Sequence, residues 1–230
     1  MTTRAGSAEA VEGRIAVPGA GEVSTLLLRP SKVSALYVLA HGAGAGMRHG
    51  FMESMAQRLA ATGMATLRYQ FPYIEARTRR PDPEPILFAT VRAAVAVGLE
   101  TAKGCPLLAG GKSMGGRMTS RAAAAEPLEG VAGLAFLGFP LHPAEKPGVK
   151  RADHLADVGI PMLFLQGTRD TLAELDLLRP VIDRLGSRAT LQVIDGADHM
   201  FHVLKRSGRT DEEVLDELAS AIAAWGEGLS

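Results

Sequence analysis

The sequence predicts an α/β protein with a mainly parallel central sheet and helices on both faces of that sheet. Strands are predicted at 35–40, 64–69, 107–109, 131–137, 160–166 and 190–194; the continuous apolar run 35–40 is typical of a strand covered on both faces. Helix-forming segments separate them, at 51–61, 86–101, 118–125, 172–185 and 211–225. Strands that alternate with helices in this way form parallel sheets, because the crossover connections place the helices on the two faces.

Three further segments complete the predicted organisation. The runs 11–17 and 23–28, joined by Pro18-Gly19-Ala20-Gly21, predict an antiparallel hairpin at the sheet edge. The proline-rich segment 71–85 predicts a long ordered loop. A length of 230 residues predicts one domain over 1–230, with residues 1–10 flexible.

Composition narrows the class of protein. The 25 basic and 25 acidic side chains balance, so nothing electrostatic favours a nucleic-acid partner. Hydrophobic residues make up 47%, the usual share for globular proteins, which does not favour a membrane partner. The first eleven residues lack the apolar core of a signal peptide, and the single Cys105 excludes a disulfide framework, so we expect a cytoplasmic protein with a reduced thiol.

The central motif is Gly111-Lys112-Ser113-Met114-Gly115, between an apolar strand and an Ala-rich helix. A serine on such a strand-to-helix turn is exposed as a nucleophile, and the two glycines allow the chain to double back. A phosphate-binding P-loop is excluded, since its first glycine position is Pro106. A dinucleotide fingerprint after residue 40 fails because Met47 replaces its last glycine.

A nucleophilic serine needs a base, and the base needs a carboxylate to orient it. Asp170 follows one strand and His199 follows the next, so Ser113, Asp170 and His199 are the predicted catalytic residues. Asp170 could instead only cap a helix, and Asp176 is a rival acid, although it falls inside the helix. A metal site formed by His199 with Asp195, Asp198 and His202 is a weaker alternative, so no metal is predicted.

Other residues are predicted to bind substrate or stabilise charge. The N–H of Met114 is one expected oxyanion donor, and Ala43, or else Gly44, supplies the other. Arg68 and Arg77 leave the same sheet edge as Ser113, as do Arg79 and Arg80, so they could hold an anionic substrate group; otherwise Arg68 is a structural anchor paired with an acid such as Glu75. His142 is a further candidate for substrate contact.

These motifs resemble those of the α/β-hydrolase superfamily: His41-Gly42, Gly111 to Arg117, Gln166 to Asp170 and Gly196 to His199. The resemblance is strongest to the small lidless members related to dienelactone hydrolases, which include the Tex-type proteins. It implies an α/β-hydrolase fold without a large lid, the nucleophile, acid and base roles for Ser113, Asp170 and His199, and no cofactor. The expected activity is hydrolysis of a small or soluble ester or thioester. Dienelactone hydrolases proper use a cysteine nucleophile where this chain has serine, and some relatives are scaffold components, so acyl transfer and a non-catalytic role are the alternatives.

Overall fold

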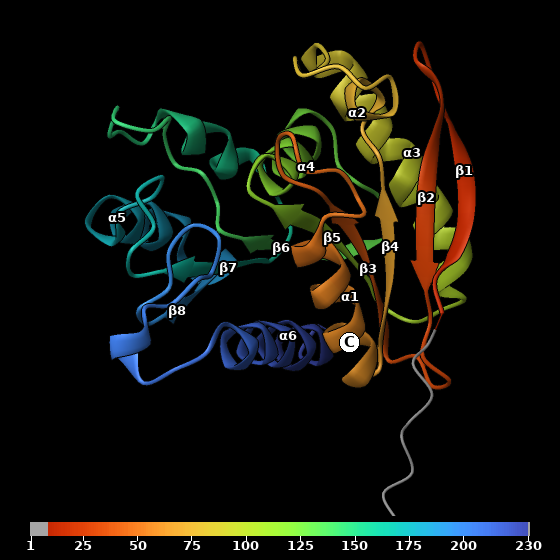
Figure 1. The fold of residues 1–230 in the computed structure, drawn as a ribbon. Helices are drawn as coiled ribbons and strands as arrows, with labels where there is room; N and C mark the ends of the chain where they lie inside the picture. The colour runs from red at the N-terminus through yellow and green to blue at the C-terminus, as the bar shows by residue number, and fades with distance from the viewer. Residues whose placement is uncertain (1–8, 230) are drawn as a thin grey trace, which may run out of the picture.

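A single sheet lies at the centre of the computed structural model, which describes residues 9–229. In that part of the chain the sheet has eight strands in the order β1-β2-β4-β3-β5-β6-β7-β8 (Figure 1). The strands are β1 Val11–Val17, β2 Gly21–Leu28, β3 Ala35–Ala40, β4 Met64–Tyr69, β5 Leu107–Lys112, β6 Val131–Leu137, β7 Met162–Gly167 and β8 Ala189–Ile194. Strands β3 to β8 are parallel, while the β1–β2 hairpin joins β4 antiparallel at the edge. The predicted mainly parallel sheet with its N-terminal hairpin is therefore confirmed.

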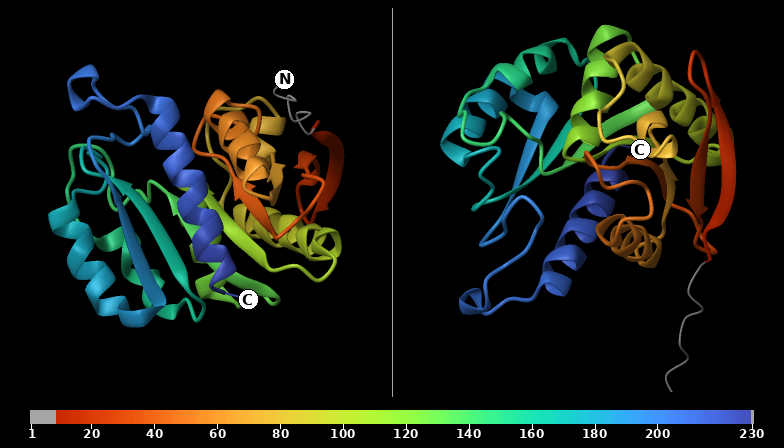
Figure 2. Two further views of the ribbon diagram at one scale, coloured as in Figure 1. Left: turned by 90° about the horizontal axis from the view of Figure 1, so that it is seen from below. Right: turned by 45° about the horizontal axis from the view of Figure 1, so that its top comes forward.

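Helices cover both faces of this sheet (Figure 2). Helices α1 and α6 pack on one face, and α3, α4 and α5 pack on the other, where the 3₁₀ helix η1 joins them. The helices are α1 Gly50–Ala61, α2 Pro72–Glu75, α3 Glu84–Ala102, α4 Met114–Ala125, α5 Leu175–Leu185 and α6 Asp211–Glu227. The 3₁₀ helices are η1 Lys150–Asp157, η2 Gly186–Arg188 and η3 Lys205–Ser207.

Strand alternation explains the two layers. Successive side chains of a strand point to opposite faces, so residues that alternate along β3 enter different cores. Leu36 and Val38 join the apolar cluster under α3 and α4, whereas Tyr37 and Leu39 join the cluster under α1 and α6. A six-residue apolar run without polar interruption, as in β3, is what a strand buried on both faces requires.

Helix α3 is the one helix within residues 9–229 that is long and apolar enough to meet the length and composition criteria for a membrane span. Seven of its 19 residues are buried, among them Leu87, Val91, Ala94 and Val95. These residues belong to the core cluster beneath the sheet. Its apolar character is therefore used in packing against the strands.

Local differences from the sequence expectations have simple causes. The segment 71–85 is not one loop: it contains α2, whose first residue is Pro72, and the start of α3, with Pro85 at an early helical position where no N–H is needed. The helix expected over 172–185 begins only at Leu175, because Asp170 to Ala173 form a turn. The flexibility expected for residues 1–10 falls largely on residues outside the described range.

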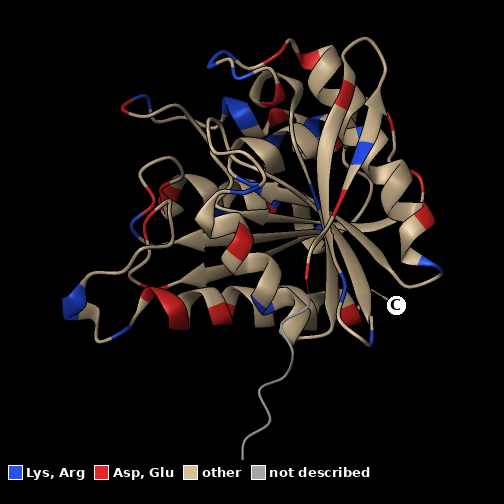
Figure 3. Cartoon of the chain, turned by 45° about the vertical axis from the view of Figure 1, so that its right-hand side comes forward, with Lys and Arg blue, Asp and Glu red and all other residues tan. Residues whose placement is uncertain are grey.

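The segment between β6 and β7 carries η1 and no lid domain (Figure 1). Lysine, arginine, aspartate and glutamate are spread over the helices and loops, and acidic residues recur along α6 (Figure 3). The loops that follow β3, β5, β7 and β8 meet at the carboxyl edge, which is where open parallel sheets bind their ligands.

Candidate active site

The turn between β5 and α4 places Ser113 at the carboxyl edge of the sheet. Ser113 has φ 50° and ψ −117°, a conformation that costs energy for a residue with a side chain. The turn closes only with glycine at its flanks: a Cβ on Gly111 would lie 2.2 Å from the carbonyl oxygen of Ala40, and one on Gly115 would lie 2.5 Å from that of His41. The strained conformation of Ser113 therefore depends on glycine at positions 111 and 115.

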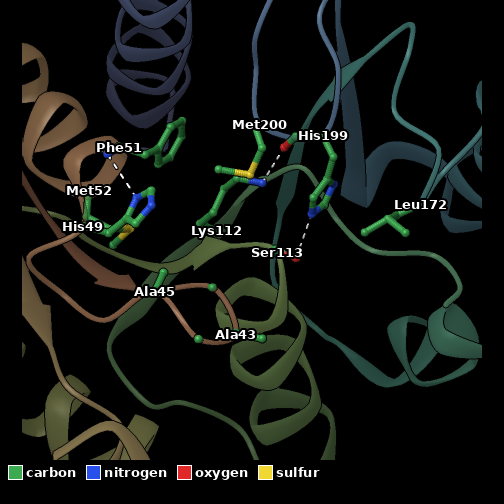
Figure 4. A pocket seen from close by; sticks show the side chains of 12 residues that line it. Ala43, Ala45, His49, Phe51, Met52, Lys112, Ser113, Leu172, His199 and Met200 are labelled. Atoms are coloured by element: carbon green, nitrogen blue, oxygen red, sulfur yellow. Dashed lines mark hydrogen bonds between the residues drawn. The ribbon is translucent and has the colours of Figure 1, made fainter. Parts of the chain in front are cut away.

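The structure brings Ser113, His199 and Asp170 into one hydrogen-bonded chain. His199 Nε2 is 2.9 Å from Ser113 Oγ (Figure 4). His199 Nδ1 is 2.7 Å from Asp170 Oδ2. A carboxylate only accepts hydrogen bonds, so Nδ1 carries the proton and Nε2 is free to accept from the serine hydroxyl. The Asp170 side chain is fully buried, whereas the His199 side chain is 18% exposed, on the side where a substrate would approach.

Two further donors fix the Asp170 carboxylate. The backbone N–H of Leu172 donates to Oδ1 at 2.8 Å, and the amide of Gln166 donates to Oδ2. Gln166 is itself held because its Oε1 accepts from the N–H of Phe139 at 3.0 Å. Sequence reasoning missed Gln166; its position as a polar residue in an otherwise apolar strand was the available signal.

The loop after β3 presents backbone N–H groups beside Ser113. The N–H of Gly44 donates to the hydroxyl of Tyr73 at 3.1 Å, so Gly44 has an acceptor for its N–H group. Within residues 9–229, the N–H groups of Ala43 and Met114 have no hydrogen-bond acceptor. Met114 is the first residue of α4, so its N–H is one of the groups that a helix leaves unpaired at its start.

A cavity of about 370 Å³ opens beside Ser113. Its lining is mainly apolar, with Ala43, Ala45, Phe51, Met52, Leu172 and Met200 around Ser113, Lys112, His49 and His199 (Figure 4). His49, for which the sequence offered no role, accepts a hydrogen bond from the N–H of Phe51 and so caps α1 at the cavity wall.

The structure does not bring Arg68, Arg77 or His142 to this cavity. Arg68 is fully buried, and its Nη1 lies 2.6 Å from Glu53 Oε2, so its partner is Glu53 and not Glu75. Arg77 is exposed, like its neighbours Arg79 and Arg80, and has φ 56°. His142 is buried and bonded to Glu174.

Comparisons with known proteins place the chain in a family. A family model described as an alpha/beta hydrolase domain matches residues 33–227. The chain belongs to the α/β-hydrolase family.

Three solved structures share the fold of this hydrolase. One is a serine hydrolase without lid from Xanthomonas campestris, 20% identical, with a TM-score of 0.74 over 94% of this chain and 95% of that one. Another is a dienelactone hydrolase from Anabaena variabilis, 21% identical, with a TM-score of 0.75 over 95% and 97% of the two chains. A serine hydrolase homologue from Coxiella burnetii is 19% identical, with a TM-score of 0.72 over 96% and 98%. The expected lidless architecture is therefore confirmed.

Lys112 lines the cavity beside Ser113 in this hydrolase, and sequence reasoning missed it. It ends β5 and is only 5% exposed, and its Nζ donates to the backbone carbonyl of His199 at 2.6 Å. The ammonium group lies 5.8 Å from the ring centroid of Phe51 and 5.4 Å from that of Phe201. Burial lowers the pKa of Lys112 to about 8, and nearby Asp170 and Asp198 partly oppose that shift. The only sequence signal was a lysine directly before the serine of the hydrolase motif.

Asp198 and His202, which were considered for a metal site, form hydrogen bonds that hold the loop after β8. Asp198 Oδ1 accepts from the N–H groups of Met200 and His202, at 2.8 and 3.0 Å, and His202 Nδ1 contacts Asp211. Across residues 9–229 of the hydrolase, no three His, Cys, Asp or Glu side chains form a group that could hold a metal ion.

His41 connects the loop after β3 to the segment after β4. Its Nδ1 donates to the carbonyl of Gly42 at 2.8 Å, and its Nε2 accepts from the N–H of Phe71 at 3.1 Å. A second proton on Nε2 would face the Phe71 N–H, so the neutral ring is the one that fits. Burial lowers the pKa of His41 to about 4, and the bond to Gly42 only partly offsets this.

We expect the hydrolase to lose stability as pH falls from about 6.5 to about 4. Over this range the unfolded His41 takes up a proton and the folded one does not, so acid favours the unfolded chain by up to about 1.4 kcal/mol per pH unit for each such histidine. His154, whose pKa burial also lowers to about 4, adds to the slope. Denaturant unfolding of wild type and His41→Asn at several pH values measures it, and a wild-type minus variant difference that is constant with pH would contradict this account.

Proposed function

We propose that this protein is a serine hydrolase that cleaves a small or soluble ester or thioester through an acyl-enzyme on Ser113. The observation that carries the proposal is the continuous hydrogen-bonded chain from Ser113 Oγ through His199 to Asp170. A surface serine rarely has a histidine at 2.9 Å that is itself oriented by a fully buried carboxylate. Such an arrangement is costly to bury and is typical of nucleophilic catalysis.

In the proposed reaction His199 Nε2 takes the proton of Ser113 as Oγ attacks the carbonyl carbon of the substrate. Asp170 stabilises the imidazolium that forms. His199 then gives its proton to the leaving alcohol or thiol as the carbon–leaving-group bond breaks, which leaves an acyl group on Oγ. A water molecule, deprotonated by His199, releases the acid and restores the serine.

The tetrahedral intermediate carries a negative oxygen that needs donors. The N–H groups of Ala43 and Met114, which have no acceptor within residues 9–229, are the proposed pair: Ala43 lines the cavity beside Ser113, and Met114 directly follows Ser113. Tyr73 supports the choice of Ala43, since it binds the neighbouring Gly44 N–H and holds the loop in place. Helix α4 begins at Met114, so the positive end of its dipole adds to the stabilisation.

The cavity indicates the substrate class. A volume of about 370 Å³ lies at the lower end of the range for small-molecule sites, and its walls of alanine, methionine, leucine and phenylalanine suit a short, uncharged acyl or alkyl group. None of the arginines 68, 77, 79 or 80 lines it, so an anionic substrate group finds no guanidinium there. Lys112 is the cation in the wall, and its ammonium is already bonded to His199.

A fluorophosphonate probe tests this proposal, because it reacts only with an activated serine. We expect wild type to be labelled at Ser113, identified by peptide mass spectrometry, and His199→Gln to be labelled far more slowly. His202→Gln is the matched control, since His202 is an exposed histidine of the same loop that contacts Asp211. Absence of labelling in folded wild type would favour a non-catalytic role on this fold.

A further inference from the structure

A second hollow, away from Ser113, is lined mainly by cationic side chains. It lies between α4 and η1 and has a volume of about 470 Å³. We call it the basic hollow; its lining residues are Arg117, Arg121, Pro143, Lys150, Arg151, Asp153 and His154. It shares no lining residue with the cavity beside Ser113.

Most of these cations lack an acidic partner. Arg121 pairs with Glu84, but among residues 9–229 no carboxylate oxygen lies within 4.0 Å of the charged groups of Arg117, Lys150 or Arg151. Asp153, the carboxylate at the rim, is exposed and pairs with none of them. The chain thus gathers three unpaired cations around one hollow in a protein whose total charge is balanced.

Arg117 gives the second observation. Its Nε is fully buried yet has no hydrogen-bond acceptor among the described residues. A solvated surface arginine leaves no such N–H group, since water satisfies each donor, and an unsatisfied buried donor costs about 1–3 kcal/mol. The buried Nε is out of reach of a ligand, so an anion in the hollow would contact the Nη groups of Arg117 and offset this cost through the same guanidinium.

The electrostatics point the same way. Burial lowers the pKa of Arg117 to about 10, and repulsion from Arg151 and Arg121 adds to the shift. Burial also lowers the pKa of Arg151, and burial together with Arg121 and Arg117 lowers that of His154 to about 4. Like charges that are partly buried side by side destabilise the unliganded protein, and a bound anion would reverse this effect.

We propose that the basic hollow binds a phosphate group, as free phosphate or as a small phosphate monoester. Arg117 and Arg151 approach the hollow from different elements, α4 and η1, so their planar guanidinium groups can each take two oxygens of one tetrahedral anion. Lys150 adds a flexible third donor. Because the hollow and the cavity have separate linings, this proposal holds whether or not Ser113 is a nucleophile.

Calorimetric titration of the full chain with inorganic phosphate tests the proposal, at constant ionic strength maintained with sodium chloride. We expect one site on wild type and a dissociation constant at least about tenfold higher in Arg151→Gln, the loss that follows when one hydrogen-bonding cation is removed from an anion. Arg79→Gln, which removes an exposed arginine outside the hollow, should bind phosphate as wild type does. A parallel titration with phenyl phosphate distinguishes free phosphate from a phosphate monoester as the ligand. Tighter binding of phenyl phosphate than of inorganic phosphate indicates a monoester.

Three results would overturn the proposal: no saturable binding of either compound to wild type, unchanged binding to Arg151→Gln, or the same response to chloride alone. Circular dichroism and thermal unfolding confirm that each variant is folded. Lys150→Gln provides a second variant at an exposed position, where loss of the fold is not expected, and it should also weaken phosphate binding. Both variants should hydrolyse esters as wild type does, since neither residue lines the cavity beside Ser113.

Discussion

Ser113→Ala is expected to lower kcat for p-nitrophenyl butyrate by a factor on the order of 10⁴ to 10⁶, because His199 then has no hydroxyl to activate. The fold should survive, since the backbone N–H of Ser113, which donates to Leu137 at 3.1 Å, is unchanged by the substitution. Steady-state kinetics measure the loss, and thermal unfolding measures stability.

The matched control is Ser120→Ala, on the helix that follows Ser113. Ser120 Oγ also contacts a histidine, with His154 Nε2 at 2.8 Å, but its hydroxyl donates to the carbonyl of Arg117 and it lines neither cavity. We expect near wild-type turnover from this variant. Comparable losses in both variants, or turnover retained without Ser113, would contradict the assignment of the nucleophile.

Asp170→Asn is expected to lower kcat by a factor on the order of 10⁴, through the wrong tautomer of His199. The backbone N–H of Leu172 holds an oxygen at the Oδ1 position, so the new NH₂ group takes the Oδ2 position, opposite His199 Nδ1, where it also loses the hydrogen bond from the Gln166 amide. An N–H donor there forces Nδ1 to accept and moves the ring proton to Nε2. His199 then faces Ser113 with a donor and cannot take its proton.

Asp176→Asn is the control for this prediction, because Asp176 is the rival carboxylate in the sequence and lies exposed in the first turn of α5. It should leave kcat within about twofold of wild type, as surface substitutions away from a site have small effects. The kinetics of the two variants, compared over the same pH range, decide between the two acids. A larger loss with Asp176→Asn would move the acid role to α5.

The sequence predicted what depends on local pattern. Ser113, Asp170 and His199 each follow a recognisable strand, and parallel strands deliver their carboxyl ends to one edge, so the residues could be grouped without coordinates. The residues that were missed, Gln166 and Lys112, lie near the ends of β7 and β5, where the local pattern shows a polar side chain but not its partner. Their roles depend on contacts with loops that are distant in the sequence: Gln166 bonds to Phe139, and Lys112 bonds to His199.

The partner of Arg68 shows why such contacts are hard to predict. Along β4, Met64 joins the core under α1 and α6, so Arg68, an even number of residues later, points to that same face, where α1 carries Glu53. Glu75 lies in α2 on the hairpin side and bonds to Ser24. Glu75 is closer to Arg68 along the chain, but the face of the sheet to which Arg68 points determines that its partner is Glu53.

Lys112 and Ser113 are consecutive residues that hold the same histidine, one by its backbone carbonyl and the other by its ring. The loop after β8 is thereby tied to the end of β5 at two points, and the proposed base and nucleophile are aligned before any substrate arrives. With no lid to close, substrate binding free energy is not consumed in assembling the site. Progress curves should accordingly be linear from the first turnover, without a lag and without stimulation by a lipid–water interface.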